Sequence, residues 1–270
     1  TLLGRDFADE TSALVLETLL AAARRGKLLL TSRYPLPDGL GDGLAAVHLG
    51  PLSLAETLRF FHRLPALAGA DAAAVSAVLR QIGGHPRSLE YLDALLRRAP
   101  GRLPHLSRHL RSEAKRQGVD LRQLGGDLDS ALRDATQLAA GNILLDALLA
   151  EFAGAPDDLE LLFQAAVYPA PVALEGLIFA PAGTGPPDET AVAAARDGAE
   201  RLAASSLLTP TGDGHVFVHR WTAESLRQHS QEDAFRARCR QAGEYLLWRV
   251  ANVSHALADG IEGVRLFLAA

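Results

Sequence analysis

The chain has 270 residues, 48% of them hydrophobic, and a formal net charge of −5 at neutral pH. This length and apolar content allow more than one buried core, so we expect about two or three small domains. The modest negative charge supplies no global attraction to nucleic acid or to an anionic membrane. One cysteine excludes an intramolecular disulfide, and no apolar run approaches the roughly 20 residues of a membrane-spanning helix. We therefore expect a cytoplasmic protein.

The first predicted strand ends in two hydroxyl side chains and an arginine. Residues 9–24 have helical spacing, and Lys27–Thr31 follows as an apolar run typical of a strand buried on both faces of a parallel sheet. Ligands bind beyond the carboxyl ends of such strands, where Thr31, Ser32 and Arg33 would lie. The planar guanidinium of Arg33 suits a terminal phosphate. Taken alone, Arg33 is better explained as a surface residue of the following loop.

A small helical domain of four helices is predicted over residues 51–125. Ser53 and Asp71 have the side chains of N-caps for the first two helices. Gly84 ends the second helix, and Pro86 occupies the first turn of the third. Taken alone, this Gly-x-Pro arrangement is an ordinary helix–helix turn.

Helices followed by a hairpin are predicted over residues 126–230, the order of a winged helix. Gly141-Asn142 is expected to interrupt the first of these helices, and Gly212-Asp213-Gly214 to form the hairpin turn. The helix over residues 188–204 would enter the major groove if this domain bound DNA. Its acidic side chains outnumber its basic ones, so it cannot gain affinity by neutralising phosphates. DNA is therefore the less favoured partner.

Two further features concern the C-terminal third of the chain. His219 ends the second hairpin strand and, by itself, is best explained as a histidine whose hydrogen bonds are satisfied by backbone. Residues 231–258 have the most regular helical periodicity, and Cys239 lies on the apolar stripe, so we expect a packed core residue and not a nucleophile. A second apolar run after a turn at Asp259-Gly260 predicts a helical hairpin, similar to the start of a tetratricopeptide-type array.

In their order along the chain, Thr31-Ser32-Arg33, Gly84-His85-Pro86 and His219 resemble the nucleotide-contacting motifs of the STAND signalling ATPases, of the NB-ARC or AP-ATPase-like type. The resemblance implies that Thr31 and Arg33 lie at the phosphate-sensing strand end. It also implies that Pro86, in the motif begun by Gly84, lies against adenine and that His219 reaches the β-phosphate of ADP. Arg220 departs from the pattern, because the best-known members carry aspartate there.

The resemblance implies a mainly α protein with four parts. They are the end of a P-loop α/β nucleotide-binding domain (1–50), a helical lid domain (51–125), a winged-helix domain (126–230) and the start of a tetratricopeptide-like array (231–270). The phosphate loop Gly-x-x-x-x-Gly-Lys-Ser/Thr does not occur, and the chain lacks methionine. We therefore expect a fragment that does not hydrolyse ATP by itself.

The function implied by the resemblance is a bacterial defence or signalling switch controlled by ADP and ATP, with Mg²⁺ in the full-length protein. Its expected partners are its own upstream P-loop domain and downstream repeats, further copies of itself on activation, and an unknown protein or small-molecule trigger. Two alternatives stay open. One is a winged-helix transcription regulator that binds DNA, and the other is a helical scaffold with no nucleotide.

Overall fold

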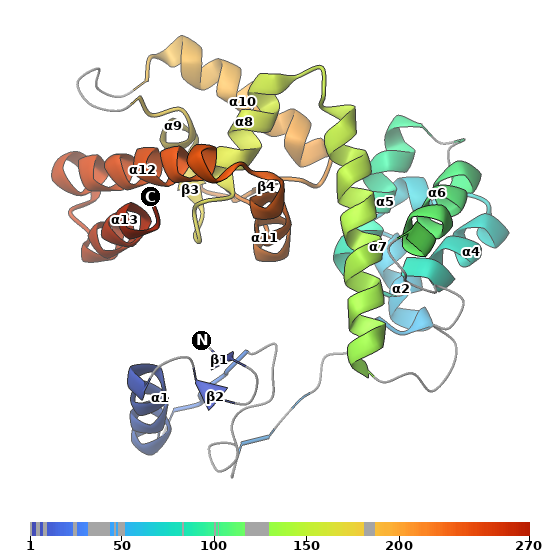
Figure 1. The fold of residues 1–270 in the computed structure, drawn as a ribbon, viewed down its shortest axis with the longest axis horizontal. Helices are drawn as coiled ribbons and strands as arrows, with labels where there is room; N and C mark the ends of the chain where they lie inside the picture. Colours follow the sequence, from blue (N-terminus) through green and yellow to red (C-terminus); the bar gives the residue numbers. More distant parts are fainter. Residues whose placement is uncertain are drawn as a thin grey trace. The chain divides into compact units, whose positions relative to one another are not determined.

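The computed structural model describes the chain except for residues 1, 4–5, 8–9, 24–25, 32–43, 46, 48–51, 83, 100, 102, 117–129 and 181–186. The described part is mainly helical, which confirms the predicted class (Figure 1). The chain divides into two compact units, Thr1–Gly50 and Pro51–Ala270. The break coincides with the first predicted boundary, whereas the boundaries after residues 125 and 230 fall inside the second unit and stay predictions.

The first unit contains a short antiparallel sheet and one helix among its described residues. The sheet pairs β1 (Leu2–Leu3) with β2 (Asp6–Phe7), and α1 (Glu10–Ala22) follows. Lys27–Thr31 forms no strand, so the predicted strand is wrong. A strand of a parallel sheet is covered on both faces, but here Leu29 is 88% exposed.

The second unit begins with packed helices that gather beside one long helix, α7 (Figure 1). Ser53 Oγ accepts a hydrogen bond from the Glu56 N–H, and the Glu56 carboxylate accepts one from the Ser53 N–H. Asp71 accepts from the Ala74 N–H at 2.8 Å, and Pro86 is the first residue of its helix. These local predictions are confirmed. The helices are α2 (Leu54–Phe61), α3 (Pro65–Ala68), α4 (Ala72–Ile82), α5 (Pro86–Arg98), α6 (Leu103–Arg116) and α7 (Ser130–Glu151).

Helix α7 continues without a break through Gly141-Asn142, where the sequence predicted an interruption. Gly141 instead makes room for another helix, because a Cβ at this position would lie 2.6 Å from the indole of Trp221 in α11 (Arg220–His229). A glycine inside a helix costs about 1 kcal/mol relative to alanine. The close approach of Trp221 explains why that cost is tolerated.

The remaining part of the second unit contains a three-stranded antiparallel sheet in the order β3–β5–β4. Val172 pairs with Val216, and Thr209 pairs with Phe217. The predicted hairpin is confirmed as β4–β5, with Gly214 at a φ of 81° in its turn. Strand β3 was not predicted, because two residues are too few to show an alternating pattern. The elements are α8 (Pro156–Ala165), β3 (Val172–Ala173), α9 (Leu174–Leu177), α10 (Glu189–Ala204), β4 (Thr209–Pro210) and β5 (His215–Phe217).

A tight turn connects α10 to β4. The N–H groups of Ser206 and Leu207 donate to the carbonyls of Ala203 and Leu202, which is the pattern of a Schellman motif. Ser206 has a φ of 57°, in the left-handed region that glycine usually occupies at this position. A non-glycine residue there costs roughly 1 kcal/mol or more. The turn is therefore held by its two backbone hydrogen bonds against local strain.

The chain ends in a helical hairpin of α12 (Glu232–Arg249) and α13 (Leu257–Ala269), joined through a π-helical turn, Val250–Ser254. The first helix ends before the predicted Ala258, because the backbone reverses at His255, which has a φ of 49°. Gly243 and Gly263 lie where the helices cross, and a Cβ at Gly243 would lie 3.0 Å from the Gly263 carbonyl oxygen. The predicted hairpin is confirmed with a shorter first helix, but the turn predicted at Asp259-Gly260 is wrong, because both residues lie inside α13.

One continuous apolar core extends through the second unit, from Val78 and Leu92 through Leu148 to Leu202. Cys239 belongs to the same core, and burial raises the pKa of its thiol, which confirms it as a packed residue. Within the described part, no helix combines the length and apolar character needed to cross a bilayer.

Candidate functional site

Two of the predicted site residues belong to the first unit. Thr31 is exposed and follows no strand, so the strand-end position predicted for it is wrong. Arg33 lies outside the described residues. Neither residue can therefore be placed with the other candidates, and their proposed role stays a prediction.

The other three predicted residues, Gly84, Pro86 and His219, lie at one junction of the second unit. Pro86 begins α5, and His219 is the N-cap residue of α11. The two helix starts meet where the rings of His85 and Trp221 have centroids 5.8 Å apart. The pKa of His85 is lowered first by burial and then by its electrostatic interaction with the nearby His219. The fold thus brings together two segments that lie far apart in the sequence of this unit.

Polar side chains hold this junction below its surface. The Tyr91 hydroxyl lies 2.6 Å from Thr222 Oγ1, and Tyr91 is fully buried. Arg87 Nε donates to the same threonine oxygen at 3.4 Å, and the guanidinium lies 5.2 Å from the centroid of the Tyr91 ring. Burial raises the pKa of Tyr91, so its hydroxyl remains a donor. Because buried polar groups are costly when unpaired, these contacts select one relative position of α5 and α11.

Gly84 has a structural explanation at this junction. A Cβ at Gly84 would lie 2.2 Å from the carbonyl oxygen of Leu52, and the Leu52 N–H donates to the Gly84 carbonyl at 2.9 Å. No side chain fits between two backbone segments at that distance. The glycine of the Gly-x-Pro motif is therefore required by packing, whether or not a ligand binds beside it.

Pro86 and His219 are exposed at the junction, whereas His85 and Trp221 are half-buried between them. His219 Nδ1 accepts a hydrogen bond from the Trp221 N–H at 3.3 Å. This geometry assigns the proton of the neutral ring to Nε2, which is then its donor nitrogen. The pKa of His85 is lowered, first by burial and then by the charges of His219 and Arg87, while Glu90 opposes the shift. His85 is therefore uncharged at neutral pH.

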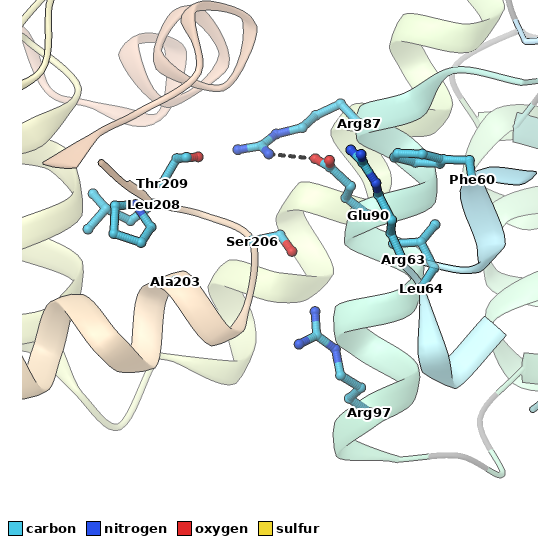
Figure 2. Close-up of a pocket in the computed structure, with 11 residues that line it drawn as sticks. Phe60, Arg63, Leu64, Arg87, Glu90, Arg97, Ala203, Ser206, Leu208 and Thr209 are labelled. Carbon is cyan, nitrogen blue, oxygen red and sulfur yellow. Dashed lines mark hydrogen bonds and ion pairs between the residues drawn. The ribbon is translucent and has the colours of Figure 1, made fainter. Parts of the chain in front are cut away.

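A cleft of about 270 Å³ lies beside this junction, and the sequence analysis did not anticipate it. Arg63, Arg87, Glu90 and Arg97 lie along one wall, and the turn from α10 into β4 forms the other (Figure 2). Arg87, Glu90 and Arg97 are spaced by three and seven residues, which places them on one face of α5. That spacing was the available signal in the sequence. The full lining is Phe60, Arg63, Leu64, Arg87, Glu90, Arg97, Ala203, Ser206, Leu208, Thr209 and Pro210.

The described residues offer no cluster of three or more His, Cys, Asp or Glu side chains suited to a metal ion. No protein-family model matches the chain, and no curated protein matches it significantly.

Proposed function

We propose that the chain is the regulatory portion of a STAND-type signalling ATPase, in which ADP or ATP controls how its helical parts are arranged. The main support is the junction at which Pro86 and His219 are both exposed beside the contact of His85 with Trp221. The sequence predicted that Pro86 and His219 contact the same nucleotide. A proline and a histidine chosen at random 133 positions apart would not be expected to lie at the same surface.

The topology around His219 agrees with this proposal. The elements α8, β3, α9, α10, β4 and β5 follow one another with the sheet order β3–β5–β4, which is the arrangement expected of a winged helix. His219 follows the last strand of that sheet and caps the next helix. This is the position that the family resemblance assigns to the histidine that contacts the phosphate.

The residues at the junction have the chemistry that a nucleotide requires. The exposed ring of Pro86 is an apolar surface without a donor, suited to one face of a base. The N-terminus of α5 contributes partial positive charge beside it. His219 is exposed at the start of α11, and an imidazole is a side chain that can donate a hydrogen bond to a phosphate oxygen. A bound nucleotide would supply a base and anionic phosphates, so these residues would connect α5 to α11 through it.

DNA binding is weaker as an alternative than the sequence alone indicates. Arg201, one of the two arginines of α10, donates from Nε and Nη2 to the two carboxylate oxygens of Asp158, each at 2.7 Å. Its charge is therefore already paired within the fold. Arg196 is then the one arginine of α10 left to set against the acidic side chains of the helix. Phosphate neutralisation by α10 would be small.

Among the expected partners, the downstream repeats have a candidate contact surface on α13. The apolar side chains of α13 are exposed along one stripe, at Leu257, Ile261, Val264 and Leu268. We include in the proposal that a further helix of the array covers this stripe, since repeat units bury such faces only against neighbours.

The fluorescence of Trp221 tests the nucleotide proposal directly. The chain has two tryptophans, and Trp248 packs elsewhere against Phe179 and Tyr245, so a Trp248→Phe background isolates Trp221. We expect ADP to change the Trp221 emission saturably, and adenosine to act less strongly because it lacks phosphate. In the same background, Pro86→Ser and His219→Ala should each weaken ADP binding by about tenfold.

Matched controls lie side by side on α6. Pro104 is near the start of that helix and His105 follows it, and both are exposed away from the junction. Pro104→Ser and His105→Ala should leave ADP affinity unchanged.

An intact polypeptide that includes a phosphate loop should retain ADP through gel filtration. Unchanged ADP affinity in both the Pro86 and His219 variants would refute the assignment.

A further inference from the structure

The cleft beside the junction contains a buried guanidinium that is only partly satisfied. Arg87 is 9% exposed and lines the cleft. Its Nε donates to Thr222 Oγ1, and its Nη1 donates to Glu90 at 2.6 Å. Its Nη2 is buried and has no hydrogen-bond partner. A buried donor without a partner is uncommon in folded proteins, and this one belongs to a residue that lines the cleft.

Further cationic groups surround the same space. Figure 2 shows the side chains of Arg63 and Arg97 on the wall that carries Arg87. Arg97 pairs with Asp93 at 3.0 Å, but Asp93 is fully buried and also accepts hydrogen bonds from two backbone N–H groups. Glu90 is the acidic residue among those that line the cleft. With Arg87 paired to Glu90 and Arg97 paired to Asp93, the charge of Arg63 leaves this wall net positive.

The opposite wall supplies hydroxyl groups and apolar surface. Ser206 and Thr209 lie across from the arginines in Figure 2, in the turn that leads from α10 into β4. Leu208 and Pro210 lie beside them, and Phe60 closes the arginine side. The site therefore combines a cationic wall with two hydroxyl groups and a small apolar area. The volume of about 270 Å³ is slightly below the roughly 300 Å³ at which ordinary ligand sites begin, which suits a small ligand.

We propose that this cleft binds the phosphate group of a small phosphate monoester, with Arg87 Nη2 as the buried donor and Arg63 and Arg97 as further cations. A phosphate is favoured over a carboxylate because it carries up to two charges and enough oxygens for several guanidinium groups and hydroxyls at once. The ligand would contact α5 on one side and the α10–β4 turn on the other. It would therefore stabilise one position of these two segments. The proposal does not depend on nucleotide binding at Pro86 and His219.

Calorimetric titration of the 270-residue chain with inorganic phosphate, at low ionic strength, tests the site. Arg63→Gln should weaken phosphate binding by roughly tenfold, and Arg87→Gln by more, because each removes a charge-assisted contact. Arg63 is exposed, so its substitution leaves the fold intact even where loss of Arg87 affects stability. The matched control is Arg59→Gln, an exposed arginine of α2 that does not line the cleft and should have no effect.

Glu90 provides a test of opposite sign. Its carboxylate both repels an anion and occupies Arg87 Nη1. Glu90→Gln should therefore tighten phosphate binding by about threefold, because it removes the repelling charge and releases Arg87 Nη1. Weaker binding in Glu90→Gln, or unchanged binding in Arg63→Gln and Arg87→Gln, would overturn the proposal.

Three probes distinguish the source of the phosphate. Acetate should bind far more weakly than inorganic phosphate, and equal binding would refute phosphate specificity. Glucose 6-phosphate that binds at least as tightly as inorganic phosphate supports a monoester. If ADP affinity falls in Arg63→Gln but not in His219→Ala, the cleft binds the nucleotide phosphates. That result would support the cleft and contradict the proposed nucleotide surface.

Discussion

The junction of α5 with α11 and the α12–α13 hairpin are both helix contacts of the second unit, but they are built differently. At the junction, Tyr91 and Thr222 are buried, share a hydrogen bond and come from positions 131 residues apart. The hairpin joins neighbouring segments across Gly243 and Gly263 and leaves an apolar stripe of α13 exposed. The hairpin contact is local and mainly apolar, with an ion pair between Arg249 and Asp259 at 3.5 Å, whereas the junction is distant in sequence and partly polar.

This difference indicates how each contact responds to change. An apolar contact between adjacent helices loses stability in proportion to the surface and volume removed. A polar junction depends on matched donors and acceptors, so loss of one partner leaves the other unsatisfied. We therefore expect the hairpin to be governed by side-chain volume and the junction by close backbone contacts and protonation.

The largest effect is expected inside the hairpin. Leu266 is 2% exposed and Leu268, two residues later on the same helix, is 84% exposed. Leu266→Ala should lower the free energy of unfolding by about 3 kcal/mol, because it leaves a cavity. Leu268→Ala should change it by less than about 0.5 kcal/mol. Urea denaturation followed by circular dichroism measures both, and equal effects would show that α13 is not packed as described.

A smaller effect separates a glycine of the junction from one of the hairpin. Gly84→Ala places a Cβ against the Leu52 backbone and should cost about 2 kcal/mol. Gly260→Ala in α13 has open space, with its nearest neighbour 3.9 Å away, and should stabilise the protein by up to about 1 kcal/mol through helix propensity. Thermal unfolding monitored by circular dichroism compares the two. A tolerated alanine at Gly84 would remove the structural explanation for that glycine.

The smallest effect concerns protonation at the junction. Because the pKa of His85 is lowered in the folded protein, the unfolded chain binds the proton more readily. The contribution of His85 to stability is therefore present above its ordinary pKa of about 6.5 and is lost as the pH falls through the lower folded value. Between about pH 7.5 and about pH 5, the wild type should lose more stability than His85→Gln. Urea unfolding midpoints measured across that pH range compare the two proteins. If the midpoints of the wild type and of His85→Gln change equally with pH, the prediction for His85 is wrong.

Local features of the chain were predictable from sequence because their causes are local. Ser53 and Asp71 cap helices through side chains three residues from their donors, and Pro86 starts α5 because its fixed φ suits a first helical turn. The strand predicted at Lys27–Thr31 failed because an apolar run shows burial only when other strands cover it.

The site was predictable only in part for the same reason. Gly84, Pro86 and His219 were selected by their order in the chain, but nothing local to them indicates that His85 and Trp221 meet. Gly141 was interpreted as a helix break because its real partner, Trp221, is distant in sequence. The arginine cleft depends on the turn at Ser206, whose left-handed backbone is not evident from a serine.

The hydrogen bond from Leu52 to Gly84 has a mechanical consequence. Leu52 is the second residue of the second unit, and its N–H is tied to the carbonyl of the turn that precedes α5. Because the Leu52 side chain also packs against the apolar core, a pull on the polypeptide from the direction of the first unit would load the turn before Pro86 and the edge of the core at the same residue. The turn before α5 is therefore hydrogen-bonded to the first part of the second unit that receives a force transmitted along the backbone.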